Sequence, residues 1–468
     1  MTIRRHSVLS LSLACSAALA LSGCATVPAD SGQREVRQLV AQRSGQPLPD
    51  VPPASLEQHI AALLAKPLSV ESAVDIAMLN NRSLRAAYAE LGIAEADLVQ
   101  AGRIANPIFS FGRLKGAHGV EIERTLMLPV ISLLTMPLAL PLERRRAEVA
   151  RLRTAGDALR IADETRRAYF SAVAAQQSAH YMDQVRSAAE ASAELARRMA
   201  QAGNWSKLQQ AREQSFYADA VAQLARARQA RTAEREKLTR LMGLWGAATA
   251  FTLPERLPEL PAAPREVGNA EADAMTNRLD ILMAQKELAG LSSSLGLTRA
   301  TRFVNLLDLS YLRNRSEEGE RTSGYEVELQ VPLFDWGGAR VARAEAMYMQ
   351  ALQNAAGIAV DARSQVRESY AGYRTAYDIA RHYRDQVVPL KKRISDEQLL
   401  RYNGMLISVF ELLADAREQV TSVNGSIEAQ RDFWIADSAL QAALSGSGSA
   451  PMSAPRAGAS APAGAPQH

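Results

Sequence analysis

The alternation of apolar and polar positions is clearest between Tyr325 and Arg340. There the apolar residues Tyr325, Val327, Leu329 and Val331 alternate with Glu326, Glu328 and Gln330. This period of two predicts a strand with one apolar face and one charged face. Pro332 ends its pairing. After Gly337 and Gly338 the chain continues for about fifty Ala- and Arg-rich residues without proline, enough for a helix much longer than those of ordinary globular domains.

A second pattern shows that this unit occurs twice, about 200 residues apart. Alternating segments at Ile108 to Phe111 and Val120 to Glu123 correspond to Leu307 to Tyr311 and to the strand at Tyr325. The segment His180 to Val185 recurs as His382 to Val387. Each half is therefore predicted to contain a helix, a strand, a turn, a second strand, a long helix, a tight turn and another long helix.

The long helices carry apolar positions spaced by three and four, the period of a coiled coil. These positions are Tyr181, Val185, Ala188, Ser192, Leu195 and Met199 in the first half, and Val366, Tyr370, Tyr373, Tyr377 and Ala380 in the second. A helix from about Leu142 to Ala202 would be about 90 Å long. Turns at Gly203 and Gly404 return the chain antiparallel, and Pro389 is expected to kink its helix.

Four two-faced strands cannot form a pore alone, because lipid cannot satisfy an open sheet edge and closed membrane barrels begin at about eight strands. Three copies would supply twelve strands and a cylinder of helices. The predicted outward residues are Val120, Ile122, Leu126, Leu128, Tyr325, Val327, Leu329 and Val331, and the predicted lumen residues are Glu121, Glu123, Thr125, Glu326, Glu328 and Gln330. The alternative is a small soluble sheet half-buried against helices.

The chain divides into six segments by composition. We predict a signal peptide at residues 1–23, a lipidated arm at 24–67, a first repeat at 68–252, a Pro-rich linker at 253–264, a second repeat at 265–444 and a disordered Gly/Ser/Ala/Pro tail at 445–468. The fold class is thus mainly α with a four-stranded β contribution and a two-fold internal repeat.

The N-terminus has the features of a secretory signal peptide. Arg4 and Arg5 precede an apolar run, and the run ends in Leu21-Ser22-Gly23-Cys24, which resembles a bacterial lipoprotein box. Lipidation is therefore expected at Cys24. The alternative is an ordinary signal peptide with an incidental cysteine. The other cysteine, Cys15, lies in the removed segment, so the mature chain has no disulfide of its own.

Neither the net charge nor the motifs indicate an enzyme or a nucleic-acid-binding protein. The net charge of +4 falls to 4 − 2 = +2 when Arg4 and Arg5 are removed, which argues against a nucleic-acid partner. The histidines lack the spacing of a zinc protease, and no phosphate-binding loop, nucleophile elbow or cysteine nucleophile is present. We expect no enzyme activity, cofactor or metal.

Three features together resemble the TolC family of outer-membrane efflux channels. They are the duplication, the joint Val331-Pro332-Leu333-Phe334-Asp335-Trp336-Gly337, and the turn Tyr402 to Ser408 leading into Leu412 to Arg417. The resemblance covers about Leu68 to Leu444, and the lipoprotein start resembles the branch that serves resistance-nodulation-division pumps. It implies a homotrimer in outer-membrane lipid, with a twelve-stranded barrel, a periplasmic tunnel of helices, a periplasmic adaptor protein and an inner-membrane pump. The first half departs from the pattern at its strand-to-helix junction, where Leu128 to Pro141 contains three prolines and neither an acid nor a glycine.

The resemblance also implies roles for particular residues. The turns containing Gly203, Ser206, Gly404 and Ser408 match the tips that contact the adaptor and narrow the closed tunnel, although a plain helical hairpin uses the same residue types. Pro332, Gly337 and Gly338 form the strand-to-helix joint.

Near the second turn, Glu411 matches a position on the tunnel wall, where three copies would form a cation-attracting ring. Asp415 follows one turn further on the same helix face. Arg401 and Tyr402 match positions that hold the helices closed. The alternative for the two acids is a surface ion pair with Arg417 or Lys207.

The leading interpretation is an outer-membrane channel of a tripartite efflux system that conducts small solutes. Two alternatives stay open: the outer-membrane component of an ATP-driven protein secretion system, and a non-conducting periplasmic coiled-coil scaffold lipoprotein. The alternating strands favour a channel over a scaffold. Neither the transported substrate nor the resting state follows from the sequence.

Overall fold

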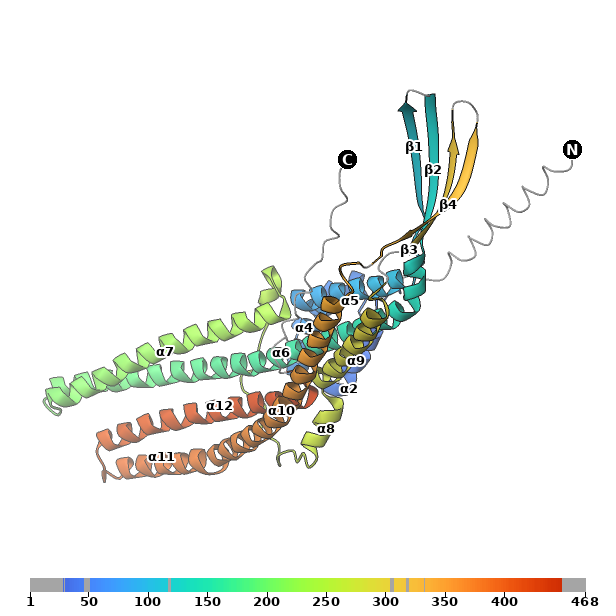
Figure 1. Cartoon of the computed structure of the whole chain (residues 1–468). Coiled ribbons are helices and arrows are strands. Elements are labelled where there is room, and N and C mark those ends of the chain that lie inside the picture. The colour runs from blue at the N-terminus through green and yellow to red at the C-terminus, as the bar shows by residue number, and fades with distance from the viewer. Residues whose placement is uncertain are drawn as a thin grey trace.

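The computed structural model describes residues 28, 30–45, 51–116, 119–303, 307–316, 320–331 and 333–447, and within these the side chains of residues 53, 116, 409, 410 and 413–416 are not described. The predicted signal peptide and Cys24 lie outside the described residues. In Figure 1 the strands project at one end, and two long antiparallel helical pairs extend at the other.

The two halves of the chain have similar orders of elements, although the first begins with two additional helices and the long helix of the second is interrupted. The first half contains the helices α2 (Gln33–Ser44), α3 (Leu56–Leu64), α4 (Val70–Asn80) and α5 (Arg82–Ala101), strands β1 (Ile108–Gly116) and β2 (Gly119–Pro129), and helices α6 (Val130–Gln201) and α7 (Lys207–Met242). The second half contains α8 (Ala270–Asn277), α9 (Leu279–Ala300), β3 (Leu307–Arg315), β4 (Arg321–Leu329), α10 (Gly338–His382), α11 (Val388–Asn403) and α12 (Val409–Ser445). Short 3-10 turns lie at Pro53–Ser55 and Gly246–Thr249.

The strands form one antiparallel sheet in the order β1-β2-β3-β4. Each half supplies one hairpin, β1 with β2 and β3 with β4, and the hairpins are joined by pairing of β2 with β3. The predicted fold class, mainly helical with a four-stranded contribution, is confirmed.

Helix α6 begins much earlier than the sequence suggested. It starts at Val130, directly after the sheet, and continues through Pro137 and Pro141, so the predicted start near Leu142 is wrong. A proline inside a helix loses one hydrogen bond and bends the helix, but it does not have to end it. With 72 residues, α6 is about 108 Å long at 1.5 Å per residue.

The seam of the first coiled coil differs in part from its prediction. Val185 and Ser192 are buried as predicted. Ala188 and Leu195 are exposed, and the residues that follow them, Ala189 and Ala196, are buried instead, as is Met182. Alanines at this seam let α7 approach closely. The seam of the second half is as expected, with Val366, Tyr373, Tyr377 and Ala380 buried.

Aromatic residues of α6, α10 and α12 connect the two halves of the chain and the linker between them. Phe170 of α6 stacks on Trp434 of α12 with ring centroids 5.2 Å apart. The hydroxyl of Tyr377 donates to the carbonyl oxygens of Pro261 and Ala262 at 3.1 and 3.0 Å, and that of Tyr373 accepts from the Arg265 amide at 2.8 Å. The linker between the halves is therefore held against α10.

The helix before Pro389 is interrupted, as the sequence predicted. A π-helical turn at Tyr383–Val387 separates α10 from α11, and Pro389 lies in the first turn of α11. A π-turn relieves the missing donor and the clash of the proline ring by inserting an extra residue into the turn.

Helix α12 extends through Ser445, and the Ser447 amide donates to the Ala442 carbonyl at 3.2 Å. The chain is thus ordered slightly beyond the predicted start of the tail, and residues 448–468 lie outside the described residues. None of the described helices combines the length and apolar character that crossing a membrane would require.

Candidate functional site

The sheet presents an exposed apolar surface on one face. Residues paired directly across antiparallel strands share a face, and the register aligns Phe109 with Leu126, Leu126 with Tyr311 and Tyr311 with Tyr325. We call this face, which carries Tyr325, the apolar face. Its exposed apolar residues are Phe109, Phe111, Leu126, Leu128, Leu309, Tyr311, Tyr325, Val327 and Leu329.

The opposite face is polar. Glu121, Glu123, Thr125, Glu326 and Glu328 alternate with the apolar residues along β2 and β4. The side chain of Asn314 donates to Glu121 on this face at 3.5 Å. The two sides that the sequence assigned to lumen and lipid are therefore two real faces of one sheet.

The sheet has two open edges. Among the described residues, strands β1 and β4 each pair on one side only, and the hairpins point away from the helices (Figure 1). Tyr325 at the β4 edge is 82% exposed. Exposed apolar strands with unpaired edges are strongly unfavourable for a soluble monomer.

The joint between β4 and α10 depends on Gly337. Its φ of 73° is left-handed, and an added Cβ would lie 2.8 Å from the carbonyl oxygen of Arg302. Its amide donates to Asp335 at 2.8 Å. Gly338 begins α10, and a Cβ added there would have no other atom within 4 Å, whereas Pro332 lies outside the described residues.

The first hairpin tip, between α6 and α7, is closed by local hydrogen bonds. Gly203 adopts φ 79°, and the Asn204 amide donates to the Met199 carbonyl at 2.9 Å. Ser206 forms a full capping box with Gln209: the Gln209 amide donates to the serine hydroxyl at 3.2 Å, and the Ser206 amide donates to the glutamine side chain at 2.8 Å.

The second tip, between α11 and α12, differs from the expectation. Gly404 has φ −79°, and Met405 takes the left-handed conformation with φ 59°. The reversal therefore does not use the freedom of Gly404. Met405 and Leu406 are 92% and 78% exposed. Ser408 caps α12 only weakly, accepting from the Glu411 amide at 3.4 Å.

The predicted ring residues lie next to this tip without forming one cluster. Glu411 is exposed in the first turn of α12, and the Ser408 hydroxyl donates to its carboxylate at 3.5 Å. Arg401 pairs with Glu397 of its own helix at 3.1 Å, and Tyr402 is 38% exposed. The side chain of Asp415 is not described.

Sequence reasoning missed the polar contact that joins the two hairpins. Glu213 of α7 is almost fully buried, accepts from the Ser192 hydroxyl at 2.7 Å and pairs with Arg417 of α12 at 2.7 Å. The Arg417 guanidinium also lies 4.5 Å from the Phe216 ring centroid. We call Ser192, Glu213 and Arg417 the interhairpin triad. Glu213 lies seven positions after Ser206, and Arg417 nine after Ser408; this similar distance from each cap was the available signal.

This contact changes one prediction. The described partner of Arg417 is Glu213, and not Glu411 as one alternative suggested; the side chain of Asp415 is not described. Arg417 therefore forms an ion pair that joins the two halves of the chain.

Exposed ion pairs surround the two hairpins. Hydrogen bonds from Arg197 and Arg198 lower the pKa of Glu194, near the first tip, to about 2. On the second hairpin, Lys391 of α11 pairs with Glu418 of α12 at 2.5 Å and its hydrogen bond lowers the pKa of that carboxyl.

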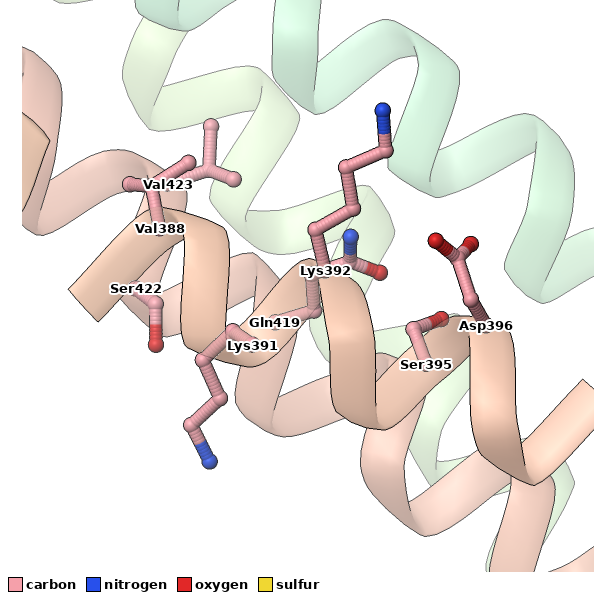
Figure 2. A pocket seen from close by; sticks show the side chains of 8 residues that line it. All are labelled: Val388, Lys391, Lys392, Ser395, Asp396, Gln419, Ser422 and Val423. Atoms are coloured by element: carbon pink, nitrogen blue, oxygen red, sulfur yellow. The ribbon is translucent and has the colours of Figure 1, made fainter. Parts of the chain in front are cut away.

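A groove lies between α11 and α12 beside this ion pair (Figure 2). It is lined by Val388, Lys391, Lys392, Ser395, Asp396, Gln419, Ser422 and Val423. Its volume of about 220 Å³ is below the roughly 300 to 1,000 Å³ typical of small-molecule sites. Among the residues that the structure describes, no group of His, Cys, Asp and Glu is placed to hold a metal.

No family model matches the sequence, but one known protein and several solved structures are similar to this chain. Protein CyaE of Bordetella pertussis is 28% identical over 409 residues, which cover 80% of this chain and 81% of that protein.

Two solved structures show the same arrangement. A membrane protein from Pseudomonas aeruginosa superposes with a TM-score of 0.70 at 20% identity, covering 80% of this chain and 92% of the other. The CmeC outer membrane channel of Campylobacter jejuni gives 0.65 at 16% identity, covering 88% and 92%. The chain therefore shares its fold with these two proteins, one of which is an outer membrane channel. The resemblance to the TolC family is confirmed at the level of the fold.

Proposed function

We propose that three copies of this chain form an outer-membrane channel. The observation that carries the proposal is the sheet itself, with an exposed apolar face, a polar face and two open edges on a support of long helices. Joining β4 of one copy to β1 of the next satisfies both edges, as lipid requires. Three copies of four strands then give a closed barrel of twelve.

The faces of the sheet assign the two environments. The apolar face contacts lipid and the face with Glu121, Glu326 and Glu328 lines the lumen. Below the membrane, α6/α7 and α10/α11/α12 of three copies form the periplasmic tunnel. Acylation of Cys24 adds a second membrane anchor beside the barrel.

The helical tips are the proposed contact with a periplasmic adaptor, which connects the channel to an inner-membrane pump. The exposed side chains of Met405 and Leu406 at the second tip support this role, because exposed apolar side chains are typical of binding sites. Gly203, Ser206 and Ser408 hold the two turns, and Gly404 lies within the second turn. The cargo is proposed to be small solutes, selected by the pump.

The gate is proposed at the level of the second tip. Three copies of Glu411 and Asp415 would form the acidic ring that attracts cations, with Arg401 and Tyr402 beside it. The interhairpin triad is the contact that holds the second hairpin against the first in this arrangement.

Single-channel recording in planar bilayers tests the proposal. Purified mature protein should be a trimer in detergent and should give discrete conductance steps. Glu411→Ala should reduce the preference for cations, with Glu90→Ala on α5 as a control at an exposed acid away from the tips. A protein that is monomeric and gives no conductance would support the scaffold interpretation and contradict the channel.

A further inference from the structure

The register of the sheet separates the charged residues of all four strands by sign. The apolar face carries only bases: Arg113, Lys115, Arg124, Arg313, Arg315 and Arg321. The opposite face carries only acids: Glu121, Glu123, Asp308, Glu326 and Glu328. The six bases, here called the basic belt, come from both halves of the chain and are all exposed.

The belt lies at the end of the sheet farthest from the helices. On β4 the order from the turn towards the helices is Arg321, Ser323, Tyr325, Val327 and Leu329. At roughly 3.3 Å per residue, Arg321 is about 13 Å beyond Tyr325. On β3 the order is mirrored, with Arg315 and Arg313 beyond Tyr311 and Leu309. An apolar band near the helices therefore ends in a basic belt near the turns.

Within the sheet the belt has no counter-charge. Arg315 and Arg321 are direct partners across β3 and β4, and Ile122 lies between Arg315 and Arg113. Like charges directly opposite each other are destabilising. Among the residues that the structure describes, none forms an ion pair with a member of the belt. A second copy added at an open edge with the same face outward would extend the belt instead of neutralising it.

We propose that the basic belt binds the phosphate-bearing headgroups of anionic lipids in the membrane leaflet farther from the helices. The proposal rests on the proposed function, in which the apolar band lies in lipid. Continuity with that band favours a lipid over free phosphate, because the acyl chains would cover the band while the headgroup reaches the belt. Guanidinium groups suit this partner, since their planar donors bind phosphate oxygens in pairs.

Lipid binding to the purified full-length mature protein tests the proposal. Titration of phosphatidylglycerol and phosphatidylcholine in detergent, followed by native mass spectrometry, should show tighter binding of phosphatidylglycerol by the wild type. Arg315→Gln with Arg321→Gln should reduce phosphatidylglycerol affinity about tenfold, since each base near an anionic surface contributes to attraction. Arg315→Lys with Arg321→Lys should retain part of the preference, because charge is kept and the planar fork is lost.

Two control variants test whether the effect belongs to the apolar face. Glu121→Gln with Glu326→Gln changes charge on the opposite face of the same sheet and should keep the wild-type preference. Glu317 and Glu318, between β3 and β4, lie outside the described residues, and their joint replacement by Gln should preserve or increase the preference. Loss of the preference in either control would overturn the proposal.

The remaining outcomes separate this proposal from the channel itself. Equal affinity of the wild type and the double Gln variant for phosphatidylglycerol would overturn the belt. Displacement of bound phosphatidylglycerol by millimolar inorganic phosphate at constant ionic strength would assign the sites to free phosphate and would also overturn it. Wild-type conductance in purely phosphatidylcholine bilayers tests the channel independently, so a conducting protein without lipid preference fails only the present proposal.

Discussion

The two helical hairpins have the same design but are held very differently. The first, α6/α7, has a glycine in the left-handed position of its tip and a complete capping box at Ser206. The second, α11/α12, places Met405 in the left-handed conformation, has a weaker cap at Ser408 and begins with a π-turn. Helix α11 has no buried residue.

The difference indicates which hairpin can move. Few buried contacts and a strained turn are the features of a segment with a low local opening free energy. We therefore expect the second hairpin to shift when the tunnel opens and the first to act as its support. The interhairpin triad would then be the contact that opening must break or rearrange.

The largest expected effect is at that contact. Arg417→Ala leaves the buried carboxylate of Glu213 without its counter-charge and should destabilise the attachment of α12 by about 2 kcal/mol. This is below the roughly 3 to 5 kcal/mol of a fully buried pair, because Arg417 is 35% exposed. Hydrogen exchange of α12 amides should accelerate. Arg417→Ala with Glu213→Gln should recover part of the loss, and strictly additive effects would show that the two residues are not coupled.

The next effects concern the turns. Gly203→Ala forces a side chain into the left-handed region and should destabilise the first tip by about 1 kcal/mol. Gly404→Ala should be nearly neutral, because φ is −79° and the nearest atom to an added Cβ is 3.5 Å away. Met405→Gly should stabilise the second tip by about 1 kcal/mol. Local exchange rates measure all three, and a costly Gly404→Ala would contradict the geometry of the second turn.

Caps provide a smaller contrast. Ser206→Ala removes a reciprocal pair of hydrogen bonds and should cost about 1 kcal/mol, whereas Ser408→Ala removes one long bond and should cost about 0.5 kcal/mol. Exchange of the first-turn amides of α7 and α12 reports the two losses separately. Equal costs would remove this part of the difference between the tips.

The smallest effect is a dependence on pH at the second hairpin. The hydrogen bond from Lys391 lowers the pKa of Glu418 below its ordinary value of 4.5. Its contribution is therefore complete above about pH 4.5 and is lost as pH falls through the lowered pKa. After correction for intrinsic rates, exchange protection of α11 should be unchanged from pH 7 to 5 and should decrease below that range. In Lys391→Gln the low-pH decrease should be smaller, and an identical decrease would contradict the assignment.

The sequence predicted much of this architecture because the relevant signals are local. Alternation at Tyr325 to Leu329 identified part of β4 and its two faces, although β4 begins earlier, at Arg321, and ends before Val331. Pro389 marked the interruption before α11. The sequence was a poorer guide where contacts with other elements determine the structure. Pro137 and Pro141 suggested a helix break, but α6 continues through both. Whether Ala188 or Ala189 is buried depends on the side of α6 against which α7 packs.

The candidate site residues show the same difference between local signals and long-range contacts. Ser206 was recognised because a capping serine acts within its own turn. At the second tip the sequence suggested Gly404 as the left-handed residue. The structure places Met405 in that conformation instead, because of the turn around it. The pairing of Glu213 with Arg417 joins residues 204 positions apart, and the basic belt depends on the register between the two hairpins.

Cysteine cross-linking across the open edges tests the central claim of a shared barrel most directly. Ser323→Cys on β4 would be combined in turn with Phe109→Cys, Phe111→Cys and Arg113→Cys on β1, in cells, where the predicted mature chain has only its acylated Cys24. We predict that at least one combination gives covalent dimers and trimers and no larger species, and that each single variant remains uncross-linked beyond a dimer. Only monomers in every combination, or a ladder that continues beyond three subunits, would contradict a closed barrel built from three copies.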